Sequence, residues 1–184
     1  SGINQLLFSN GVPIDIDTLI KPSVSGKVPI NVVYLNTIQT EAQKHYFVQE
    51  ISRALYSWML DQESADNKLK LLFFMDEVAP YLPPAPRNPP AKDLIKLIFK
   101  QARKYGVASV LATQNVSDVD YKIMAQANTK FIGRFTQPQD IDKVKHLLKE
   151  DGGNLDMITE LPNLGPGQFQ MVSPDVSKKA IPLQ

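Results

Sequence analysis

Two adjacent carboxylates, Asp76 and Glu77, follow directly on a mostly apolar run, residues 69–75. A short apolar run of this kind predicts a strand that is buried on both faces, as in parallel α/β sheets. Ligands of such sheets bind at the carboxyl ends of the strands. An aspartate placed there can hold Mg²⁺ through water, and a neighbouring glutamate can polarise the water that attacks a phosphoryl group. A strand that simply ends in a solvated turn explains the same acidic pair about equally well.

Gln114 stands at the end of the next predicted strand, residues 107–113. A glutamine at this point can hydrogen-bond a γ-phosphate or the water that attacks it. The alternative is a polar residue that merely terminates a strand. The position of Gln114, one strand–helix unit after the acidic pair, favours a shared site.

Two arginines are candidates for contact with a phosphate. Arg103 lies in the last turn of a predicted helix over 91–105, where a cation is favourable by ~0.3–1 kcal/mol because of the helix dipole. That structural explanation is sufficient by itself. The functional alternative is an arginine finger that reaches the nucleotide of a neighbouring subunit. Arg134, near the end of a predicted strand over 129–135, is the second candidate.

The elements that must position these residues alternate between strands and helices. Strands are predicted over 29–36, 69–75, 107–113, 129–135 and 167–172, and helices over 40–62, 91–105, 121–126, 138–149 and 155–161. This alternation predicts parallel βαβ units with right-handed crossovers. We therefore expect one α/β domain with a mainly parallel sheet of about five strands. Thr40 is the expected N-cap of its helix, Gly106 the expected C-cap, and the proline-rich segment 80–90 an extended surface loop.

Composition narrows the class of protein. The 184 residues are 43% hydrophobic and 21% charged, which is ordinary for a globular domain, and the net charge of +1 does not favour a nucleic-acid or membrane surface. The absence of cysteine rules out disulfides and thiolate metal sites and favours a reducing, cytoplasmic setting. The glycine-rich phosphate loop G-x-x-x-x-G-K-[ST] does not occur in the sequence.

Taken together, the motifs resemble the HerA–FtsK superfamily of hexameric DNA-pumping ATPases, and most closely HerA-type helicases. The resemblance covers about residues 28–175 and rests on the order of five segments: 71–77, 102–106, 111–114, 127–134 and 161–168. Conjugative and type IV secretion motor ATPases look similar over the same elements and are the nearest alternatives.

The resemblance implies the C-terminal part of a three-layer RecA-like (P-loop NTPase) domain. Within it, Asp76 would be the Walker B residue that holds Mg²⁺ through water, and Glu77 the catalytic base. Gln114 would be the sensor and would also contact the nucleotide. Arg103 would be a catalytic arginine that reaches the phosphates, and Arg134 a nucleotide contact, with action within or across subunits left open.

The resemblance also implies ATP and Mg²⁺ as cofactors of a longer parent protein. Its partners would be DNA, other copies in a hexameric ring, and a nuclease or processing protein, and no membrane is expected. Residues 1–28 would be an irregular segment that continues from an upstream region, 29–175 the ATPase part, and 176–184 a tail. The start Ser1-Gly2 without a methionine agrees with that expectation.

Because the phosphate loop is missing, we expect the 184-residue chain to be inactive alone. Two other classes compete with the motor. One is a non-catalytic oligomerisation or partner-binding module with a degenerate ATPase fold. The other, a receiver-like domain phosphorylated on Asp76, is disfavoured because the predicted strand over 29–36 ends without a carboxylate.

Overall fold

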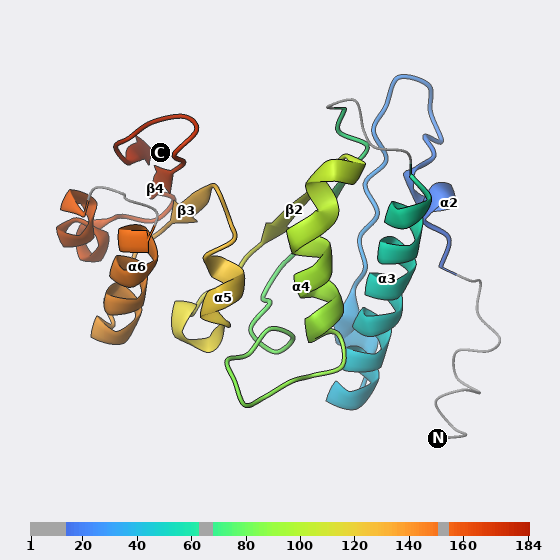
Figure 1. Ribbon diagram of the computed structural model, residues 1–184, viewed down its shortest axis with the longest axis horizontal. Helices are drawn as coiled ribbons and strands as arrows, with labels where there is room; N and C mark the ends of the chain where they lie inside the picture. The colour runs from blue at the N-terminus through green and yellow to red at the C-terminus, as the bar shows by residue number, and fades with distance from the viewer. Residues whose placement is uncertain (1–13, 63–67, 151–154) are drawn as a thin grey trace. The chain divides into compact units, whose positions relative to one another are not determined.

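The computed structural model describes residues 14–62, 68–150 and 155–184. The chain divides into two compact units, and Figure 1 shows their elements. The first unit contains residues 1–75 and 88–111, and the second contains 76–87 and 112–184. The sequence predicts one α/β domain, with its ATPase part over residues 29–175, and that division stays a prediction.

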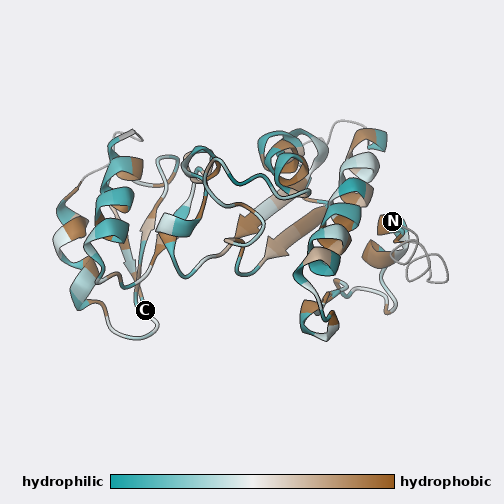
Figure 2. Cartoon of the chain, turned by 90° about the horizontal axis from the view of Figure 1, so that it is seen from below, coloured by the Kyte–Doolittle hydropathy of each residue, from teal (hydrophilic) through white to brown (hydrophobic). Residues whose placement is uncertain are grey.

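The described residues of the first unit contain a parallel pair of strands, three α-helices and two short 3-10 helices, which are labelled η. Its elements are α2 (Ile16–Ile20), η1 (Leu35–Thr37), α3 (Glu41–Asp61), β1 (Leu71–Met75), α4 (Lys92–Gln101), η2 (Ala102–Tyr105) and β2 (Val107–Leu111). The strands pair in parallel from Leu71 opposite Val107 to Met75 opposite Leu111. Figure 2 shows both strands as largely hydrophobic, which agrees with the apolar runs in the sequence.

One face of β1 is buried against helices of the first unit. Leu71 and Phe73 pack against a core that includes Leu55, Met59 and Ile98. Leu72 and Phe74, which alternate with these two residues along β1, are each more than half exposed. The sequence predicted burial on both faces, and that prediction is wrong for this structure. An apolar run shows that both faces of a strand could be buried. Which face is buried depends on the helices and strands that pack against it.

The predicted helix ends of the first unit are confirmed. The Thr40 side chain accepts a hydrogen bond from the Gln43 N–H at 3.3 Å and caps α3. Gly106 ends η2 with φ of 77°, a left-handed conformation that glycine adopts without steric cost.

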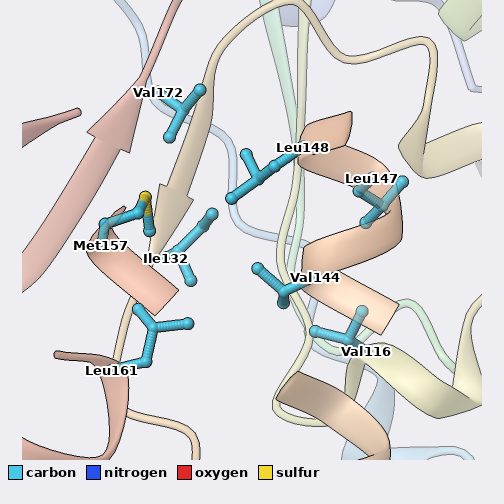
Figure 3. Close-up of a cluster of buried hydrophobic side chains, with 8 residues drawn as sticks. All are labelled: Val116, Ile132, Val144, Leu147, Leu148, Met157, Leu161 and Val172. Carbon is cyan, nitrogen blue, oxygen red and sulfur yellow. The ribbon is translucent and has the colours of Figure 1, made fainter. Parts of the chain in front are cut away.

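The second unit contains an antiparallel sheet covered by short helices. Its elements are η3 (Val116–Asp118), α5 (Tyr121–Met124), β3 (Lys130–Ile132), α6 (Pro138–Glu150), η4 (Asp156–Thr159), η5 (Leu161–Asn163), β4 (Phe169–Val172) and β5 (Ile181–Leu183). The sheet order is β3-β4-β5, and both pairings are antiparallel. Side chains from α6 point toward the sheet in Figure 3, where Val144 and Leu148 lie close to Ile132.

The predicted sheet of about five mainly parallel strands is wrong in the described residues. They form a two-stranded parallel sheet and a three-stranded antiparallel sheet. An apolar pattern locates a strand, but the strand's direction depends on the edge it pairs with. β3 and β4 are antiparallel although α6 lies between them in the sequence. A direct return over residues 173–180 then brings β5 against β4 within the predicted tail.

The predicted strand over 29–36 is also absent from the structure. Its β-branched residues are largely exposed, with Ile30 at 87% and Val32 at 82% exposure, and η1 begins at Leu35. β-branched residues favour an extended backbone, but a strand requires a partner edge that local sequence cannot supply. Among the described residues, no helix combines the length and apolarity that crossing a membrane requires.

We predict that Leu148→Ala destabilises the second unit by about 2–5 kcal/mol, because it opens a cavity in the core drawn in Figure 3. Leu148 is 0% exposed, whereas Leu60, also near the end of a helix, is 51% exposed. Leu60→Ala is therefore the matched control and should change the free energy of unfolding by about 0.5 kcal/mol or less. Urea unfolding followed by circular dichroism measures both, and equal losses would contradict the assigned core.

Candidate functional site

Two loops leave the parallel strand pair at the same edge. We call residues 76–82 the acidic loop and residues 112–120 the glutamine loop. Met75 and Leu111, the last residues of β1 and β2, lie opposite each other in the register. Because parallel strands run in the same direction, both loops begin at the carboxyl edge of the pair.

Two backbone hydrogen bonds join these loops within the second unit. The Val78 N–H donates to the Ala112 carbonyl at 3.0 Å, and the Asp120 N–H donates to the Leu82 carbonyl at 2.8 Å. Val78 and Leu82 are 1% and 0% exposed, so the joined backbone groups lie beside buried side chains. The structure thus brings the acidic pair and Gln114 onto two loops that are bonded to each other.

The acidic pair has an unusual backbone conformation. Glu77 has φ of 48°, in the left-handed region, although it is not a glycine. The Asp76 carboxylate accepts the Glu77 N–H at 3.0 Å across this turn. A left-handed residue with a Cβ costs roughly 1–2 kcal/mol, and such strain is concentrated at functional sites. Asp76 is exposed and Glu77 half-buried, so a carboxylate is accessible at this edge.

Gln114 has an exposed side chain on a well-bonded backbone. The Thr113 hydroxyl accepts the Asn115 N–H at 3.3 Å and lies 3.2 Å from the Asn115 carbonyl, to which it can donate. The Asn115 side-chain amide donates to the Asp118 carboxylate at 3.2 Å. These bonds hold the backbone on both sides of Gln114. The direction of the Gln114 side-chain amide therefore depends on the conformation of the loop.

A buried polar cluster behind the glutamine loop was missed by the sequence analysis. Asp140, only 6% exposed, accepts hydrogen bonds from the Ser117 N–H at 3.0 Å and the Ser117 hydroxyl at 2.6 Å. The Lys143 ammonium donates to the carbonyls of Ser117 and Val119 at 3.0 and 3.1 Å. Burial lowers the pKa of Lys143 below its ordinary value, against the opposing effect of nearby carboxylates such as Asp118. An aspartate in the first turn of a helix is explained by the helix dipole alone, so no local pattern indicated this contact.

The two candidate arginines lie elsewhere along the chain. Arg103 is exposed in η2, just before the amino end of β2, whereas the glutamine loop begins at the carboxyl end of that strand. Arg134 is exposed two residues beyond β3. The roles predicted for both arginines stay predictions.

The acidic loop can supply the few protein ligands that Mg²⁺ needs when it is bound together with a nucleotide. Across residues 14–62, 68–150 and 155–184, no group of three histidines or carboxylates forms a potential metal site. Mg²⁺ bound with a nucleotide needs fewer protein ligands, because one or two carboxylates act together with phosphate oxygens and water. The exposed Asp76 carboxylate meets that requirement, and the metal would supply charge neutralisation at the phosphates.

Sequence comparison identifies relatives among archaeal helicases, although no protein-family model matches the chain. The chain is 24% identical over 162 residues to a probable helicase from Methanocaldococcus jannaschii, a match that covers 83% of this chain and 31% of the relative. It is 26% identical over 164 residues to the DNA double-strand break repair helicase HerA from Sulfolobus acidocaldarius, covering 88% and 32%. The chain is a relative of HerA-type helicases. It spans about a third of the length of these two relatives.

Comparison with solved structures shows which fold this chain resembles. The genome packaging NTPase of Sulfolobus turreted icosahedral virus 2, solved in complex with ATP-gammaS, superposes with a TM-score of 0.57 over 93% of this chain and 71% of that one. The sequence identity is 13%, so this likeness concerns the fold alone. The predicted α/β class is therefore confirmed, and the fold of the chain is that of a P-loop NTPase.

We predict that Glu77→Gly gives a protein about 1 kcal/mol more stable than Glu77→Ala, because only glycine adopts the left-handed conformation without a Cβ clash. At an ordinary position the order is reversed, since glycine loses more backbone entropy on folding. Denaturant midpoints of the two variants measure the difference. An alanine variant as stable as the glycine variant would show that Glu77 is not held in this conformation.

Proposed function

We infer that this chain supplies the Walker B and sensor part of a RecA-like ATPase that moves along or unwinds DNA. The main support is the pair of hydrogen bonds that joins the acidic loop to the glutamine loop at one sheet edge. The relationship to HerA-type helicases supports the same conclusion. The phosphate-binding loop of such an engine would come from outside these 184 residues.

Each residue of the two loops has a chemical role in this proposal. Asp76 holds Mg²⁺ through water, and the metal neutralises charge on the phosphates. Glu77 polarises the water that attacks the γ-phosphoryl group and takes up its proton. Gln114 hydrogen-bonds the γ-phosphate or that water, so it distinguishes ATP from ADP.

The arginines and partners complete the proposal. Arg103, exposed in η2, reaches the phosphates of a nucleotide bound by its own copy or by a neighbouring copy in a hexameric ring. Arg134 contacts the nucleotide from its exposed position after β3. DNA is the translocated partner, which agrees with the names of the relatives and of the packaging NTPase.

We predict that the purified 184-residue chain does not hydrolyse ATP measurably. Backbone amides and a lysine of the phosphate loop provide most of the grip on the phosphates, and the sequence lacks that loop. Phosphate release with Mg²⁺ and double-stranded DNA tests this directly, with a buffer blank as control. Robust ATP turnover by this chain would refute the proposal that the phosphate-binding loop comes from outside these 184 residues.

We predict that Glu77→Gln abolishes hydrolysis in a polypeptide that carries both this chain and a phosphate-binding loop. Loss of the carboxylate should lower kcat by at least about 10²-fold, while ATP still binds because Asp76 and the loop remain. Glu41→Gln, on the exposed first turn of α3, is the matched control and should retain full activity. Wild-type turnover in the Glu77→Gln protein would remove Glu77 from catalysis and favour the non-catalytic module.

A further inference from the structure

The cluster behind the glutamine loop connects that loop to α6. Ser117 follows Gln114 by three residues, and both of its donors, N–H and hydroxyl, point to one oxygen of Asp140. One turn further along α6, Lys143 donates to the carbonyls of Ser117 and Val119. Four hydrogen bonds thus join two α6 side chains to residues 117–119, three of them through backbone groups and one through the Ser117 hydroxyl.

The cluster is not needed to attach α6 to its sheet. The apolar face of α6 already packs in the core of the second unit, through Val144, Leu147 and Leu148. Val116, at the start of η3, joins the same core and is 7% exposed. α6 is therefore fixed by apolar packing, and the polar side chains on it act on the glutamine loop.

The burial of Asp140 makes the contact specific. A carboxylate that is 6% exposed is costly unless hydrogen bonds satisfy it, and the described donors are the two groups of Ser117. Lys143, which is desolvated as well, has backbone carbonyls as its described acceptors, so both charged groups are directed at residues 117–119. A shift of this segment away from α6 would leave a buried carboxylate and a desolvated ammonium without those partners.

We propose that Asp140 and Lys143 are positioning residues for Gln114: they clamp residues 117–119 to α6 and so fix where the Gln114 amide is presented. The inference depends on the proposed role of Gln114 for its functional meaning. Its structural part does not depend on that role, and the two can be tested separately.

The structural test uses the 184-residue chain labelled with ¹⁵N. In Asp140→Ala and in the milder Ser117→Ala, we expect lower heteronuclear NOE values for the amides of residues 113–119 and for the Gln114 side chain. Exchange of the Ser117 N–H should accelerate about tenfold in Asp140→Ala. The methyl signals of Val144 and Leu148 should stay in place, because apolar packing holds α6.

The controls separate positioning from general loss of stability. Asp142→Ala removes an exposed carboxylate from the same helix and should leave residues 113–119 ordered. Ser117→Thr keeps both donors and should restore the order lost in Ser117→Ala. Unchanged order at 113–119 in Asp140→Ala and Ser117→Ala, or equal loss of order throughout the second unit, would overturn the proposal.

The functional test uses the phosphate-loop polypeptide described above. Asp140→Asn should lower kcat about tenfold with KM for ATP nearly unchanged, because the nucleotide is gripped elsewhere and only Gln114 is displaced. If Gln114→Ala lowers kcat but Asp140→Asn does not, the positioning role is refuted. If Gln114→Ala has no effect while the NMR result holds, the clamp stands and the proposed sensor role fails instead.

Discussion

The candidate site depends on the hydrogen bonds between the two loops that leave the parallel strand pair. The strands end in register, and the Val78 N–H then bonds to Ala112 before either loop diverges. A second bond, from Asp120 to Leu82, closes the far side of the same loops. A carboxylate pair and an amide are thereby carried on a shared backbone frame rather than on independent surface turns.

Two residues near these loops have unfavourable local features. Glu77 adopts a left-handed backbone that a glycine would adopt more easily, and Asp140 is a buried carboxylate satisfied by Ser117. The left-handed conformation of Glu77 is strained, and such strain is concentrated at functional sites. Both features lie in or against the loops that carry Asp76 and Gln114.

The comparisons and the geometry support each other at different levels. The relationship to HerA-type helicases covers most of this chain but only about a third of the length of those proteins. The likeness to the packaging NTPase extends the agreement to the fold. The hydrogen bonds within the second unit add what neither comparison provides, namely that the loop with Asp76 and Glu77 is joined to the loop with Gln114.

The local features of this chain follow from residues that are close together in the sequence. The run 69–75 with its acidic end, the cap at Thr40 and the turn at Gly106 were predictable, because apolar periodicity and capping depend on neighbouring residues. The tertiary structure alone decided the direction of β3, β4 and β5, the unpaired state of residues 29–36, and the contact of Asp140 with Ser117. Those features depend on partners distant in the chain, and a strand or a buried carboxylate carries no local mark of the partner it will find.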